Sequence, residues 1–242
     1  MCGIFFSLST SKPTPPAQET CSLLQKRGPD SVQTHTVQKE VDALDEKSPP
    51  CSYHLTFISS VLSLRGNHVY SQPIVDHATQ SVLCWNGEAW KIAGEKVQGN
   101  DTERVFDLFL QAIDCCDRKQ ATERLADAIA SISGPFAFVF YDAVHSRLFF
   151  SRDCLGRRSL LQGVDKDGAL KICSICDGSS STHFEEVRMN GVAMIDLGRY
   201  GDSARSPGKL YEIQTLPWSS DPSPPVGHLV CVAFYRSTQE KK

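Results

Sequence analysis

The 242-residue sequence contains no apolar run that approaches the roughly 20 residues a helix needs to cross a lipid bilayer. The N-terminus also lacks the basic start and long apolar stretch of a secretory signal peptide. Positive charge is not in excess, because 25 Lys and Arg stand against 28 Asp and Glu, for a formal net charge of -3. We therefore predict a cytoplasmic protein that binds neither nucleic acid nor membrane.

The sequence also lacks the spacings that mark a metal or nucleotide site. Cys173 and Cys176 form one CxxC pair, whereas a structural zinc site needs a second pair of ligands at a suitable spacing. Walker loops and dinucleotide fingerprints are absent, so we predict no metal and no cofactor. Because cytoplasmic thiols stay reduced, the ten cysteines are expected to be free.

The apolar patterns predict strands, then two adjacent helices, then strands again. Asn100 is expected to cap the first helix, which continues to residue 113, and the second covers 121–132. A short helix before Gly28 and a polar loop over 35–50 complete the first half. Strands are expected over 2–8, 53–64, 81–85, 135–141, 147–151, 159–162, 170–175 and 192–197. This order is typical of a layered α+β fold.

The composition changes after residue 197. Residues 198–225 are rich in Gly, Ser, Pro and Asp, as expected of a linker, and 228–235 could form one further strand. We therefore predict a domain over 2–197, followed by a linker or truncated extension over 198–242.

Cys2 directly follows the initiator methionine, which is normally removed before so small a residue. Cys2 would then carry a free α-amine, with an ordinary pKa of about 7.7 to 8.0, beside a thiol of pKa about 8.5. One residue would hold both a nucleophile and its base. The ordinary alternative is that Cys2 merely follows the start codon, and the rest of the sequence decides between the two.

Short motifs follow the MCGI start in a definite order. Each alone has an ordinary explanation, such as a hairpin turn at Asn-Gly or a helix cap at Asn-Asp. In sequence order the motifs are RGPD at 27–30, LRG at 64–66, QP at 72–73, NGE at 86–88, GNDTE at 99–103, GPF at 134–136 and RDxxG at 152–156. Together they resemble the glutaminase domain of class II glutamine amidotransferases, in the Ntn-hydrolase superfamily. The likeness is greatest to asparagine synthetases, especially asparagine synthetase domain-containing proteins, and covers about residues 2–197.

The resemblance implies a four-layer αββα sandwich of two antiparallel sheets with helices outside. It implies that Cys2 attacks the side-chain amide of L-glutamine, which gives a γ-glutamyl thioester and releases ammonia. Asn86, through its side-chain amide, and Gly87, through its backbone N–H, match the oxyanion hole of the family.

The resemblance also implies the residues that bind the substrate's ends. Arg65 matches the arginine that takes the substrate carboxylate in a bidentate contact. Asp101 matches the carboxylate that faces the substrate ammonium, and Glu88 is implied to contribute to recognition of the same group. Arg152 and Asp153 are expected to form a structural ion pair behind the site.

The sequence departs from the family pattern beside the predicted pocket. Family members commonly read NGEIYN, whereas Ala89, Trp90 and Lys91 follow Glu88, and Ser159 stands where the synthetases have proline. The SGGxDS loop of a synthetase domain is also missing, so the ammonia is expected to reach a synthetase domain or subunit outside this chain.

Three functional hypotheses follow. The leading one is a glutaminase that supplies ammonia to an asparagine-synthetase-like domain. The alternatives are an inactive glutamine-binding or interaction module, and an Ntn amidohydrolase that acts on another γ-glutamyl amide.

Overall fold

The computed structural model describes residues 1–41, 51–176, 182–198 and 211–218. Most of its strands form two six-stranded antiparallel sheets. In order across the first sheet these are β13 (His183–Glu186), β11 (Leu161–Val164), β12 (Leu170–Cys173), β1 (Gly3–Ser9), β3 (Cys51–Val61) and β2 (Ser31–Val41). Across the second sheet they are β15 (Gln214–Pro217), β14 (Gly191–Asp196), β10 (Arg147–Arg152), β9 (Phe136–Asp142), β5 (Val82–Gly87) and β4 (Ile74–Val75).

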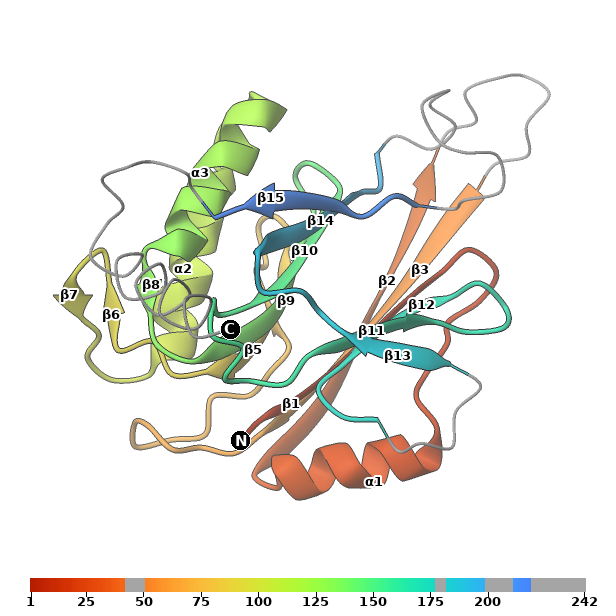
Figure 1. The fold of residues 1–242 in the computed structure, drawn as a ribbon, viewed down its shortest axis with the longest axis horizontal. Helices are drawn as coiled ribbons and strands as arrows, with labels where there is room; N and C mark the ends of the chain where they lie inside the picture. The colour runs from red at the N-terminus through yellow and green to blue at the C-terminus, as the bar shows by residue number, and fades with distance from the viewer. Residues whose placement is uncertain (42–50, 177–181, 199–210, 219–242) are drawn as a thin grey trace, which may run out of the picture.

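In the described part of the chain, three helices cover the outer faces of these sheets (Figure 1). The helix α1 (Gln18–Arg27) packs on the first sheet, whereas α2 (Asp101–Ile113) and α3 (Arg118–Ala130) pack on the second. A small third sheet of β7 (Glu95–Lys96), β6 (Lys91–Ile92) and β8 (Ile132–Ser133) lies beside α2 and α3 (Figure 1). The predicted four-layer αββα sandwich is confirmed.

The first strand, β1, lies in the middle of its sheet because both of its faces are apolar. Ile4, Phe6 and Leu8 point into the core between the two sheets, and Phe5 points the other way, against Leu24 of α1. Burying a side chain of this size contributes about 1.5 to 3 kcal/mol relative to its exposure, so the strand is favoured between two layers rather than at an edge.

Aromatic side chains fill both sides of the second sheet. Phe57 of the first sheet meets Tyr141 of the second, with ring centroids 6.3 Å apart. On the helical side, Phe109 of α2 packs edge-on against Phe138 and Phe140, at 5.2 and 5.3 Å. Helices and sheets are thereby joined into one stack of layers.

The two adjacent helices are present, with the predicted cap on the first and shifted ends on the second, which stops at Ala130 rather than at residue 132. Asn100 caps α2, because its side-chain oxygen accepts a hydrogen bond from the N–H of Thr102 at 2.9 Å. The helix α3 begins three residues earlier than expected, since Asp117 caps it by accepting from the N–H of Gln120 at 2.6 Å.

The expected loop over 35–50 is wrong for residues 35–41, which belong to β2. This strand pairs with β3 along its whole length, from Ser31 opposite Val61 to Val41 opposite Cys51. Most of its side chains are partly or fully exposed, so backbone pairing rather than apolar burial holds it at the edge of the sheet. The short strands β13 and β15 were not predicted either, for the same reason.

The strand β15 lies within residues 198–225, where a linker was expected, and pairs with β14. The division of the chain at residue 197 stays a prediction. The strand expected over 228–235 lies outside the described residues.

The expectation that all ten cysteines are free is wrong, because Cys154 is disulfide-bonded. Cys84 is a free thiol, fully buried in the apolar core between the two sheets.

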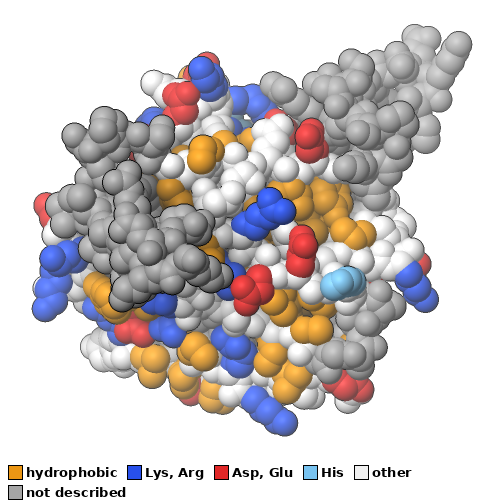
Figure 2. Space-filling model, in the orientation of Figure 1, with side chains coloured by type: hydrophobic (Ala, Val, Ile, Leu, Met, Phe, Trp, Pro, Cys, Tyr) orange, Lys and Arg blue, Asp and Glu red, His pale blue; other side chains and the backbone are white. Residues whose placement is uncertain are grey.

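Charged side chains of both signs are interspersed on the face seen in Figure 2. Within residues 1–41, 51–176, 182–198 and 211–218, no helix is long and apolar enough to span a bilayer. The same ranges contain no cluster of His, Cys, Asp and Glu that could hold a metal ion.

Candidate functional site

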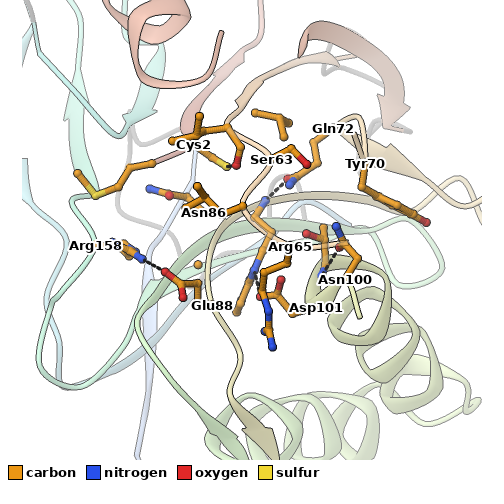
Figure 3. A pocket seen from close by; sticks show the side chains of 17 residues that line it. Cys2, Ser63, Arg65, Tyr70, Gln72, Asn86, Glu88, Asn100, Asp101 and Arg158 are labelled. Carbon is orange, nitrogen blue, oxygen red and sulfur yellow. Dashed lines mark hydrogen bonds and ion pairs between the residues drawn. The ribbon is translucent and has the colours of Figure 1, made fainter. Parts of the chain in front are cut away.

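One pocket collects all six residues that the sequence analysis singled out (Figure 3). It lies where the start of β1, the chain that follows β3, the end of β5 and the start of α2 meet. The six predicted residues are Cys2, Arg65, Asn86, Gly87, Glu88 and Asp101; among their neighbours in the lining are Ser63, Tyr70, Gln72 and Arg158. The six residues are therefore spread over about 100 positions of the chain but line one pocket.

The RGPD motif fixes the backbone on two sides of this pocket. The Nε of Arg27 donates to the carbonyl oxygen of Cys2 at 3.2 Å, and the carboxylate of Asp30 accepts from the N–H of Ser63 at 2.7 Å. Gly28 passes so close to β3 that an added Cβ would lie 2.3 Å from the carbonyl carbon of Ser60. A glycine is needed there because no side chain fits between the two backbones.

The thiol of Cys2 is partly buried and faces the carbonyl oxygen of Leu62, with the sulfur 3.8 Å from that oxygen. Burial raises the pKa of this thiol above its ordinary value. The hydrogen bond to Leu62, the terminal ammonium of the chain and Arg158 act in the opposite direction. The neutral thiol therefore prevails near neutral pH, so a reaction through its sulfur needs a base.

The pair Asn86 and Gly87 is part of β5 and not a hairpin turn. Asn86 lies opposite Ala137 and Gly87 opposite Phe136 in the ladder with β9. Asn86 is 2% exposed, and its Nδ2 has no hydrogen-bond partner in the part of the chain that the structure describes. An unpaired buried donor costs about 1 to 3 kcal/mol, so this amide is poised for a ligand atom rather than for the fold.

Asp101 is the first residue of α2 and is buried at the pocket, where one of its two carboxylate oxygens accepts hydrogen bonds from the protein. Its Oδ2 accepts from the indole Nε1 of Trp85 at 3.1 Å and from the N–H of Ala89 at 2.8 Å. Within the described residues, Oδ1 has no hydrogen bond. One carboxylate oxygen thus holds the residue in place and the other is left to a ligand.

Arg65 is held by backbone carbonyls. Its Nη1 donates to the oxygen of Ala89 at 3.0 Å and its Nη2 to the oxygen of Val97 at 3.4 Å. Because Ala89 contributes only its backbone here, its departure from the family pattern leaves these contacts intact. Trp90 is half exposed, and the guanidinium carbon of Arg157 lies 5.4 Å from the centre of its ring.

Arg158 is a pocket residue that the sequence reasoning missed. Its Nη2 donates to Oε1 of Glu88 at 2.8 Å (Figure 3), and its buried Nε has no hydrogen-bond partner among the described residues. Arg158 belongs to the GRRSLL motif at 156–161, but nothing in the sequence connects this motif to Glu88, which lies 70 positions earlier.

Arg152 and Asp153 lie outside the pocket lining, and the ion pair expected between them is wrong. Arg152 binds Glu186 at 2.6 Å, whereas Asp153 binds Arg157 at 2.8 Å and accepts from the N–H of Phe136 at 3.1 Å. Both residues tie connections together behind the site, each with a different partner from the one predicted.

Comparison with known proteins gives the same picture of the chain. A family model described as "Glutamine amidotransferase domain" matches residues 1–211. "Asparagine synthetase domain-containing protein 1" of Gallus gallus is 32% identical over 198 residues, which cover 81% of this chain and 28% of that protein. The Mus musculus protein of the same name is 30% identical over 228 residues, 90% of this chain and 32% of its own length. "Asparagine synthetase [glutamine-hydrolyzing]" of Homo sapiens is 31% identical over 101 residues, 40% of this chain and 16% of that protein.

Solved structures agree on the fold. A glutamine phosphoribosylpyrophosphate amidotransferase from B. subtilis superposes with a TM-score of 0.52 at 14% identity, over 90% of this chain and 50% of that one. A structure titled as the allosteric regulatory enzyme of purine biosynthesis gives 0.54 at 15% identity, over 90% and 49%. The chain spans about a third of the length of the curated relatives named asparagine synthetase domain-containing protein 1. It belongs to the class II glutamine amidotransferase domain family, with the Ntn-hydrolase fold and a relationship to asparagine synthetase.

Proposed function

We propose that this domain hydrolyses L-glutamine to glutamate and ammonia, with Cys2 as the nucleophile. Once Met1 is removed, the α-amine of Cys2 accepts the thiol proton, and the sulfur attacks the side-chain amide carbon of glutamine. The carbonyl oxygen becomes an oxyanion, the amine then gives the proton to the leaving nitrogen, and ammonia departs from a γ-glutamyl thioester. Water, deprotonated by the same amine, cleaves the thioester to glutamate and restores the thiol.

The unpartnered Nδ2 of Asn86 is the observation that carries this proposal. It lines the same pocket as the thiol of Cys2, and a tetrahedral oxyanion would supply the acceptor that it lacks. The backbone N–H of Gly87 would be the second donor. An added Cβ at Gly87 would lie 2.8 Å from both the oxygen of Pro135 and Cβ of Phe136, so no larger residue fits.

Arg65 and Asp101 would hold the two ends of the amino acid. The guanidinium of Arg65 would take the α-carboxylate, and the free Oδ1 of Asp101 would accept from the α-ammonium, together with Glu88. We further propose that the ammonia passes to an asparagine-synthetase-like domain or subunit and that the protein acts in the cytoplasm, where its nucleophilic thiol stays reduced. The names of its relatives support this destination.

Ammonia release from L-glutamine tests the proposal, with the wild type compared with Cys2→Ala and Cys2→Ser. We expect release by the wild type, none above background with Ala, and at most a trace with Ser, because an alcohol ionises far less readily than a thiol. Equal release by Cys2→Ala would assign the chemistry to another residue. A wild-type protein that starts at Cys2 and binds glutamine without releasing ammonia would instead identify a binding module.

A further inference from the structure

The pocket contains an ion pair that joins two distant parts of the chain. Arg158 lies in the connection from β10 of one sheet to β11 of the other, and it binds Glu88 directly after β5, at 2.8 Å. The side chain of Arg158 is 17% exposed and that of Glu88 is 36% exposed. The pair is therefore partly shielded from water and stronger than a fully exposed one.

Glu88 needs such a partner because a second carboxylate lines the same pocket. Asp101 is buried and held by two hydrogen bonds, so like-charge repulsion would move the longer and less constrained Glu88 away from it. Arg158 neutralises Glu88 and restrains its Oε1. Within the described residues, Oε2 of Glu88 and Oδ1 of Asp101 make no hydrogen bond to protein. Two such oxygens suit an ammonium group, which carries three N–H donors and accepts nothing.

We propose that Arg158 is a positioning residue that gives the pocket its selectivity for substrates with a free α-ammonium group. Arg158 acts by holding the carboxylate of Glu88 at the pocket that Asp101 also lines, and it does not itself touch the substrate. The inference rests on the proposed function, since it takes L-glutamine as the ligand.

The test compares L-glutamine with glutaramic acid, the same molecule without its α-amine. Binding of each to Cys2→Ala protein is measured by calorimetry, alone and with Arg158→Gln added. We expect Arg158→Gln to weaken the binding of glutamine about tenfold and to change the binding of glutaramic acid less than about twofold. Arg104→Gln is the matched control, because Arg104 is an exposed residue of α2 outside the pocket lining. It should change neither affinity.

A double-mutant cycle tests whether Arg158 changes glutamine binding through Glu88. Glu88→Gln should reproduce the loss, and adding Arg158→Gln to it should cause no more than about a twofold further loss, because the carboxylate to be positioned is already gone. Arg158→Lys keeps the charge but loses the planar fork, so it should recover only part of the selectivity for glutamine over glutaramic acid.

Equal weakening of both ligands by Arg158→Gln would overturn the inference, because it would mean a general distortion of the pocket. Full additivity of the Glu88 and Arg158 substitutions would overturn it as well. These outcomes differ from a failure of the proposed function, which would appear as glutamine binding without ammonia release by the wild type.

Discussion

The pocket at Cys2 and a buried cluster at Asp142 are both polar sites within an apolar fold, and they differ in how fully their groups are bonded. Asp142 is fully buried and accepts from Arg147 at 2.8 and 3.2 Å and from the ring and backbone nitrogens of His145, each at 3.0 Å. Arg147 also donates to the carbonyl oxygen of Arg118 and to the hydroxyl of Thr122, both on α3.

In the pocket, by contrast, several groups are held in place without being satisfied. Within the described residues, the Nδ2 of Asn86 is a buried donor with no partner, and one oxygen each of Asp101 and Glu88 is not hydrogen-bonded. The hydrogen bonds of the Asp142 cluster join the hairpin of β9 and β10 to α3. In the pocket, some hydrogen-bonding groups have no protein partner within the described residues, as expected of a site that binds a ligand.

The largest effect should come from breaking the satisfied cluster. Arg147→Ala leaves Asp142 charged and buried, which should lower the free energy of unfolding by about 3 to 5 kcal/mol in urea titrations. Lys119→Ala, which removes an exposed ion pair with Glu123, is the control and should change stability by no more than about 0.5 kcal/mol. A loss below about 1 kcal/mol for Arg147→Ala would mean that the cluster does not carry the stability assigned to it.

Substitutions at the two ends of the proposed substrate should come next. Arg65→Ala and Asp101→Asn should each cost about 2 to 5 kcal/mol of binding, seen mainly as a higher KM for glutamine, because in the proposed complex these groups would contact substrate ions that change little during the reaction. Steady-state kinetics would check this. If kcat fell far more than KM rose, the two residues would belong to the chemistry and not to recognition.

Asn86→Ala should reverse that pattern. In the proposed mechanism the amide faces charge that exists only in the tetrahedral intermediate, so kcat should fall by about two to three decades while KM changes little. The free energy of unfolding should stay close to that of the wild type, since the side-chain nitrogen has no hydrogen-bond partner among the described residues. A rise in KM alone would refute the oxyanion-hole assignment.

The smallest effect near neutral pH should come from Cys84, the cysteine buried between the sheets. Burial raises the pKa of its thiol from 9.0 to about 12, so the folded state keeps a proton that the unfolded state loses above pH 9. Its contribution to stability is present below pH 9 and is lost as the pH rises towards 12, by at most about 1.4 kcal/mol per pH unit. Urea titrations from pH 8 to 10.5 should show a shallower loss for Cys84→Ala, and an unchanged slope would contradict this.

The sequence patterns predicted the strands and helices that bury apolar side chains, and missed the strands that are held mainly by backbone hydrogen bonds. The strand β1 was predicted from its apolar run, whose residues face both ways, and α2 because Asn100 is followed by an amphipathic pattern. The strand β2 has polar, exposed side chains, so only its pairing with β3 reveals it. Such pairing depends on a distant partner that no local pattern encodes.

The same division applies to the pocket. The six predicted residues lie in motifs whose order carried the resemblance, and they adjoin one cavity. Arg158 escaped prediction because its significance depends on Glu88, and the partners of Arg152 and Asp153 were mistaken because adjacent residues on a strand end point to opposite sides.

A processed Cys2 is the proposed nucleophile of this pocket, and intact mass measurement after incubation with a glutamine-like diazoketone tests this assignment. We predict a chain that begins at Cys2 and gains a single adduct, which L-glutamine competes away and Cys2→Ala abolishes. A protein that releases ammonia with Met1 still attached, or an adduct that forms equally on Cys2→Ala, would refute the assignment.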